Sequence, residues 1–190
     1  PIYTLLPYTT LFRSTTISPN RKFIAKISRF RLTVLHDHAE LAGLKDEGVI
    51  QPAELLWARD SKRFFINEDD GGTTGTWTVI VYDVNSREVS RFDVTKNVLK
   101  RVQNLYPCDT PEIPNIAAIG WINRSDSLAV IAQVPPHSSC PQMGKYVGYL
   151  ISIPSGQILR EITEPSALIE AWSKYMAPSL LERVKLAMKE

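Results

Sequence analysis

Three stretches of the chain share one pattern of hydrophobic and polar positions. In each, a large apolar residue ends a short β-rich run, a polar turn follows, and a second β-rich run begins. The three copies are 17–24, 57–64 and 121–128. A polar turn between two hydrophobic runs predicts a β-hairpin. The recurrence of this pattern predicts a fold built from repeated hairpin units.

The second halves of two of these units also correspond. Residues 82–89 align with residues 151–158, and in both a long apolar run meets a tight turn and returns as a short run. Residues 76–84 are apolar on both faces of a strand, which is typical of a strand covered on both sides. The pattern therefore predicts two units of four antiparallel strands, at 53–93 and 116–163. A partial first unit is predicted at 15–36.

The first copy of the pattern also resembles a known repeat. Its sequence, Ile-Ser-Pro-Asn-Arg-Lys-Phe-Ile-Ala at 17–25, is similar to the Trp-Ser-Pro-Asp-Gly-Lys type of repeat in TolB-like and WD40-like β-propellers. The copies that start at Trp57 and Trp121 are looser. The resemblance covers about residues 17–163, implies stacked four-stranded blades, and brings no catalytic residues with it.

The chain departs from the propeller pattern in the number of its units. Only two full units and a partial one are visible, whereas closed propellers usually have about four to eight blades. A helix-like insert also separates the repeats. The resemblance therefore leaves two architectures open: a truncated propeller, or a small two-sheet domain that uses the blade unit.

The helix-like insert is predicted at 95–106, between the two full units. Its apolar residues fall on one helical face: Val98, Leu99, Val102, Leu105 and Tyr106. Asp93 or Thr95 can cap its start, and Pro107 follows its end.

Helices are also predicted for residues 164–190. Pro165 suits a first helical turn, and Pro178 breaks or restarts the helix. The apolar stripes are Leu168, Trp172 and Met176 in the first segment, and Leu180, Leu181, Val184, Ala187 and Met188 in the second. The predicted fold class is mainly β: propeller-like, antiparallel four-stranded repeat units with an inserted helix and a helical C-terminus.

The tryptophans are predicted to have structural roles. Trp57 and Trp121 occupy equivalent repeat positions, so both are predicted to be core anchors of their units. Trp77 begins the strand that is covered on both faces. Trp172, on the C-terminal helix, is the tryptophan expected to form an exposed contact.

Residues 1–14 are predicted to be a non-native segment. Within them, Pro-Tyr-Thr-Thr-Leu-Phe-Arg-Ser at 7–14 resembles the translated sequencing-adapter string that contaminates some assemblies. The alternative interpretation is a short apolar N-terminal strand. With this segment set aside, the repeat domain spans 15–163.

Composition narrows the classes of partner. The net charge of +2, with 22% charged and 44% hydrophobic residues, is that of an ordinary globular domain. A net charge this small creates no overall electrostatic field that would attract nucleic acid. No run of the sequence approaches the 18 apolar residues that a membrane span needs. We therefore expect a protein or small-ligand partner, no nucleic-acid partner and no transmembrane span.

Two cysteines bear on the cellular compartment. Cys108 and Cys140 each lie beside a proline in a turn-rich stretch. Such a pair suits a disulfide and an extracytoplasmic location, periplasmic or secreted. The alternative is a pair of unbridged thiols.

His36, His38 and Glu40 are the candidate metal ligands. If His36 and His38 lie on one strand, their side chains point the same way and can converge on a metal ion. The third ligand would be Glu40 or His137. The alternative interpretation is a cluster of polar residues at a strand edge or turn.

The stretch 135–145 is the most unusual loop, and it predicts a binding site. Long loops on a rigid β scaffold are where recognition tends to be located. The candidate binding residues are His137, Ser138, Ser139, Gln142 and Lys145. The chain has no nucleophile elbow, P-loop or dinucleotide fingerprint. We therefore expect a non-catalytic protein- or ligand-binding module without a cofactor. The alternative is a metal-dependent hydrolase that uses His36 and His38.

Overall fold

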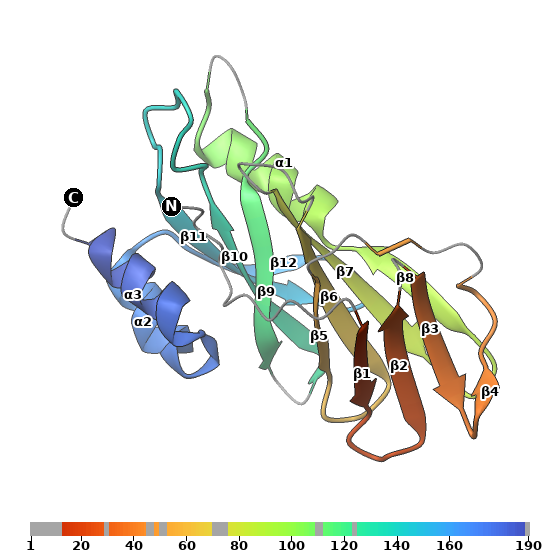
Figure 1. Cartoon of the computed structure of the whole chain (residues 1–190). Helices are drawn as coiled ribbons and strands as arrows, with labels where there is room; N and C mark the ends of the chain where they lie inside the picture. The colour runs from red at the N-terminus through yellow and green to blue at the C-terminus, as the bar shows by residue number, and fades with distance from the viewer. Residues whose placement is uncertain are drawn as a thin grey trace.

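The structure is a computed structural model that describes residues 13–28, 31–44, 48–49, 53–69, 76–108, 112–122 and 125–188. Three four-stranded antiparallel sheets follow one another along the chain and lie side by side in that order (Figure 1). Within each sheet the strands also keep chain order, so each sheet is an antiparallel meander. The prediction of a mainly β fold with four-stranded antiparallel repeats is confirmed at this level.

The element bounds are as follows. Sheet one contains β1 (Arg13–Ile17), β2 (Phe23–Ser28), β3 (Arg31–His36) and β4 (Ala39–Glu40). Sheet two contains β5 (Ala53–Trp57), β6 (Arg63–Asp69), β7 (Trp77–Val84) and β8 (Val89–Asp93). Sheet three contains β9 (Asn115–Ile122), β10 (Ser127–Gln133), β11 (Tyr146–Ser152) and β12 (Ile158–Ile162). The helices are α1 (Thr95–Leu105), α2 (Pro165–Trp172), the short 3₁₀ helix η2 (Ser173–Tyr175) and α3 (Pro178–Leu186).

The first sheet is larger than the partial unit predicted at 15–36. Its four strands run from Arg13 to Glu40, because a two-residue turn returns the chain as β4. Arg13 and Ser14, placed by the sequence in the non-native segment, pair with Ser28 and Ile27 in β1. Residues 1–12 of that segment lie outside the described residues.

One position in the turn that opens each unit has a positive φ angle in all three units. Arg21, Ser61 and Ser125 stand at this position of the sequence alignment, and their φ angles are 62°, 62° and 82°. Positive φ is uncommon for residues other than glycine. Its recurrence at one aligned position supports the equivalence of the three units.

A hydrogen bond between neighbouring units is also repeated. The Trp57 indole N–H donates to Thr16 Oγ1 over 3.2 Å, and the Trp121 indole N–H donates to the Leu56 carbonyl over 3.1 Å. Thr16 directly precedes Ile17, and Leu56 directly precedes Trp57. Each indole therefore binds the residue before the equivalent position of the preceding unit. The burial of the two rings differs, because Trp57 is buried and Trp121 is only half-buried.

Three hydrophobic clusters hold the layers together. The first lies between sheets one and two, and the second joins sheets two and three with the buried face of α1. The third lies between sheet three and the C-terminal helices, which cover the outer side of that sheet (Figure 1). No helix among the described residues is long and apolar enough to span a membrane.

Trp172 belongs to the third cluster, so the expectation that it forms an exposed contact is wrong. Its side chain is 5% exposed. Gly148 of β11 lies beneath it, and a Cβ atom there would collide with the side chains of Leu168 and Trp172. Because glycine has no side chain at this position, α2 can approach the sheet closely enough to bury the apolar face of the helix.

Candidate functional site

The predicted metal ligands His36 and His38 do not share a strand face. Asp37 and His38 have φ angles of 48° and 69° and form the two-residue turn between β3 and β4. His36 is the last residue of β3 and pairs with Ala39 across that turn. The premise that both imidazoles project from one continuous strand is therefore wrong, because the strand ends between them.

His36 and Glu40 each have a partner of their own. The His36 ring stacks on Phe23 with 4.9 Å between ring centroids. An Arg31 guanidinium nitrogen lies 2.9 Å from Glu40 Oε1 in an exposed ion pair. Within the part of the chain that the structure describes, no three His, Cys, Asp or Glu side chains gather into a group that could hold a metal ion.

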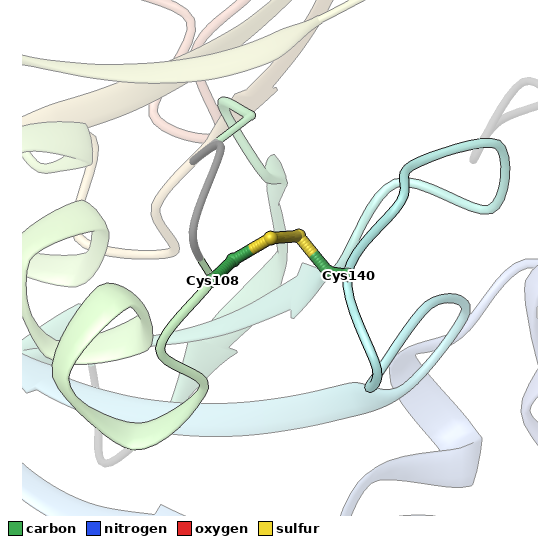
Figure 2. Close-up of a disulfide and its surroundings, with 2 residues drawn as sticks. All are labelled: Cys108 and Cys140. Atoms are coloured by element: carbon green, nitrogen blue, oxygen red, sulfur yellow. A yellow bond between two sulfur atoms is a disulfide. The ribbon is translucent and has the colours of Figure 1, made fainter.

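The predicted disulfide is confirmed. Cys108 and Cys140 are bridged, and their Cα atoms are 5.3 Å apart. The bridge ties the segment after α1 to the loop between β10 and β11 (Figure 2). Backbone hydrogen bonds also close the base of this loop, from the Val134 N–H to the Lys145 carbonyl and from the Gly144 N–H to the Val134 carbonyl.

The five predicted binding residues of the loop differ in exposure. His137, Ser139 and Lys145 are exposed, Gln142 is half-buried, and Ser138 is buried at 7% exposure. The Ser138 hydroxyl makes no hydrogen bond to any residue that the structure describes. Of the five, Lys145 lines one of the two cavities described next, and the other four line neither.

Two cavities lie at this end of the third sheet. The first, which we call the proline cavity, has a volume of about 290 Å³ and is lined by Val102, Gln103, Tyr106, Pro107, Cys108, Glu112, Pro114, Val134, Pro135 and Cys140. The second, which we call the helix cavity, has a volume of about 450 Å³ and is lined by Tyr106, Lys145, Tyr146, Thr163, Glu164, Pro165, Ser166, Ala187 and Met188. The disulfide forms part of the wall of the first cavity.

Tyr106 lines both cavities. It follows the last residue of α1, and its backbone N–H donates to the Val102 carbonyl over 2.8 Å, which continues the helical hydrogen bonding. Burial raises the pKa of its hydroxyl, and the negative charges of Glu161 and Glu164 raise it further. The hydroxyl is therefore held protonated and available as a hydrogen-bond donor.

The cavity walls consist mostly of residues that the sequence did not single out. Tyr106 was recognised as part of the apolar face of a helix, whereas Tyr146 was placed only within the predicted unit at 116–163. A polar aromatic residue directly before the Pro107-Cys108 pair was an available signal for Tyr106. No local signal could have linked Glu164 to Lys145, because they line one cavity only through the packing of α2 on sheet three.

No protein-family model matches the chain, and no curated protein matches it in sequence.

The disulfide provides the first testable prediction. Replacing both cysteines with serine is expected to lower the free energy of unfolding by about 3–4 kcal/mol, because the bridge closes a loop with a sequence separation of 32 residues. Urea unfolding monitored by tryptophan fluorescence measures this change. Reduction should destabilise the parent protein and leave the double variant unchanged. Two free thiols in the denatured, unreduced parent would contradict the bridge.

Proposed function

We propose that this protein is a non-catalytic binding module that takes a small ligand in the proline and helix cavities. The observation that carries the proposal is the sharing of Tyr106 between two cavities of about 290 and 450 Å³. Sites for small molecules are typically concave, mostly apolar and supplied with a few polar groups, with volumes of roughly 300–1,000 Å³.

The rigidity of the surrounding elements supports this proposal. The proline cavity is bounded by α1, by the disulfide and by three prolines, whose backbones are restricted. Val102 of α1 is buried in the cluster that joins sheets two and three. A site whose walls are held in this way loses little conformational freedom on binding, which favours affinity.

The disulfide also supports a proposal about location. We infer an extracytoplasmic setting, periplasmic or secreted, because disulfides persist in oxidising compartments and are rare in reducing ones. The bridge connects two sides of the proline cavity. Reduction would therefore loosen the site itself.

The propeller resemblance remains part of the same proposal. We infer that the three units are related to the blades of TolB-like or WD40-like propellers. The repeated positive φ angle and the repeated indole hydrogen bond support a common ancestral unit. In such proteins the blades serve as a scaffold, which agrees with a binding role rather than a catalytic one.

Ligand-detected NMR with a fragment library of charged and uncharged compounds tests the proposed function. Fragments that bind the parent protein are expected to lose binding in Tyr106→Trp, in which a larger ring fills space in both cavities. Leu56→Ala is the control, because Leu56 is an exposed residue of β5 and lines neither cavity. Fragments that bind Tyr106→Trp as well as they bind the parent would contradict the proposal, provided that the variant melts like the parent.

A further inference from the structure

Two charges of opposite sign line the helix cavity. Lys145 precedes β11, and Glu164 precedes the first residue of α2. Neither side chain makes an ion pair with any residue in the described part of the chain. Both residues are exposed, and they directly precede β11 and α2, two elements that contact each other.

Lys145 and Glu164 are the charged residues of the cavity wall, and Lys145 directly precedes Tyr146. We call Lys145 with Tyr146 the positive pole of the cavity and Glu164 its negative pole. Arg183 of α3 lies outside the wall, and its positive charge opposes the rise in pKa that burial causes for Tyr146. Glu161 also lies outside the wall, and its charge is paired with Arg101.

The hydroxyl of Tyr146 can donate a hydrogen bond, and no described residue accepts one from it. Tyr146 is 4% exposed and lines the helix cavity. Its hydroxyl makes no hydrogen bond to any residue within the described ranges. The hydroxyl oxygen itself is not fully buried, so solvent or a ligand in the cavity can reach it. A ligand oxygen at the positive pole would accept its hydrogen bond.

The two cavities differ in polarity, and Tyr106 joins them. The proline cavity is lined by three prolines, two valines and the disulfide, together with Tyr106, Gln103 and Glu112, whereas the helix cavity carries Lys145 and Glu164. A ligand that spans both therefore needs a dipolar head and an apolar body. A purely anionic ligand would leave Glu164 facing a like charge, and a purely cationic ligand would do the same to Lys145. Like charges brought together at a binding site are unfavourable.

We propose that this site binds a free α-amino acid with an apolar side chain. The carboxylate accepts hydrogen bonds from the Lys145 ammonium and the Tyr146 hydroxyl. The ammonium group donates to the Glu164 carboxylate beside the Tyr106 ring, and the apolar side chain enters the proline cavity. This inference rests on the proposed function, because it specifies the ligand of the same two cavities.

Isothermal titration calorimetry with L-leucine, L-methionine and L-phenylalanine tests the ligand class. N-acetyl-L-phenylalanine, which lacks the ammonium charge, and L-phenylalaninamide, which lacks the carboxylate, are the matched probes. Each is expected to bind at least about tenfold more weakly than L-phenylalanine, because each lacks one of the two charged groups that the site would hydrogen-bond. Equal binding of L-phenylalanine and either analogue would overturn the inference.

Two variants test which residue binds each charged group of the amino acid. Lys145→Gln is expected to weaken L-phenylalanine binding and to remove the difference between L-phenylalanine and its amide. Glu164→Gln is expected to remove the difference between L-phenylalanine and its N-acetyl derivative. Lys62→Gln and Glu170→Gln are the matched controls, since both residues are exposed and line neither cavity. Retention of both discriminations in the two pole variants would overturn the assignment.

The outcomes also separate this inference from the proposed function. If the amino acids produce no binding heat while Tyr106-dependent fragments still bind, the amino-acid inference fails and the binding module stands. If no compound binds in a manner that depends on Tyr106, both fail. Binding of the amino acids with loss in Tyr106→Trp supports both.

Discussion

Replacing Trp57 with alanine is expected to lower the free energy of unfolding by about 3–5 kcal/mol, the usual cost of truncating a large buried aromatic residue. The Trp57 ring is 8% exposed and lies between Phe23 and Phe64, with centroid separations of 6.3 and 4.8 Å. Its indole N–H also donates to Thr16 Oγ1. The substitution therefore opens a cavity between sheets one and two and removes a hydrogen bond that links them.

Trp121→Ala is the matched control at the equivalent repeat position. Trp121 is only half-buried and packs against Phe65 with 5.9 Å between ring centroids. Less apolar surface returns to water, so we expect a smaller loss of about 1–3 kcal/mol. Chemical denaturation followed by far-UV circular dichroism measures both values. Equal losses would contradict the difference in burial, and Trp57→Phe provides a milder change if the alanine variant does not fold.

The second large effect is expected at Asn67, which joins sheets two and three. Its side chain is fully buried at 0% exposure. Its amide nitrogen donates to the Ala118 carbonyl over 2.8 Å, and its amide oxygen accepts from the Ala118 N–H over 2.8 Å. β9 is an edge strand of sheet three, and its pairing with β10 shifts register between Ala118 and Gly120. Asn67 thus binds the backbone of the edge strand as a neighbouring strand would.

Asn67→Leu is expected to lower the free energy of unfolding by about 3–5 kcal/mol. Leucine fills a similar volume but leaves the N–H and the carbonyl of Ala118 without partners, and each buried unpaired group costs about 1–3 kcal/mol. Asn97→Leu is the control, because Asn97 is exposed and donates one hydrogen bond to the Gly156 carbonyl. A loss no larger than that of Asn97→Leu would show that Asn67 does not hold the two sheets together.

The candidate site could be predicted only in part. The cysteine pair was predictable, because two cysteines beside prolines leave few structural alternatives. The binding role of the unusual loop stays a prediction, and of its five candidate residues Lys145 lines one of the two cavities described above. The metal hypothesis also stays a prediction, but its premise of one continuous strand was wrong. Whether the chain between His36 and His38 stays extended or turns depends on backbone angles that strand periodicity does not encode.

The hydrophobic pattern alone determined the repeated units of the chain. Strand, turn and helix depend on side-chain period and on local turn chemistry, which a sequence displays directly. The helical insert was therefore predicted at 95–106 and is found at Thr95–Leu105. The sequence alignment also showed that the opening turns are equivalent. The positive φ angle that they share at one position agrees with this equivalence.

The tertiary structure alone decided which faces are buried and which residues meet. Trp57 and Trp121 align in sequence, yet their burial differs because each packs against a different neighbouring layer. Trp172 is buried because Gly148, far from it in sequence, leaves room for its ring. The presence of Lys145 and Glu164 in the wall of one cavity likewise requires α2 to pack on the third sheet. Contacts of this kind depend on the shapes of surfaces distant along the chain, which no local pattern of residues records.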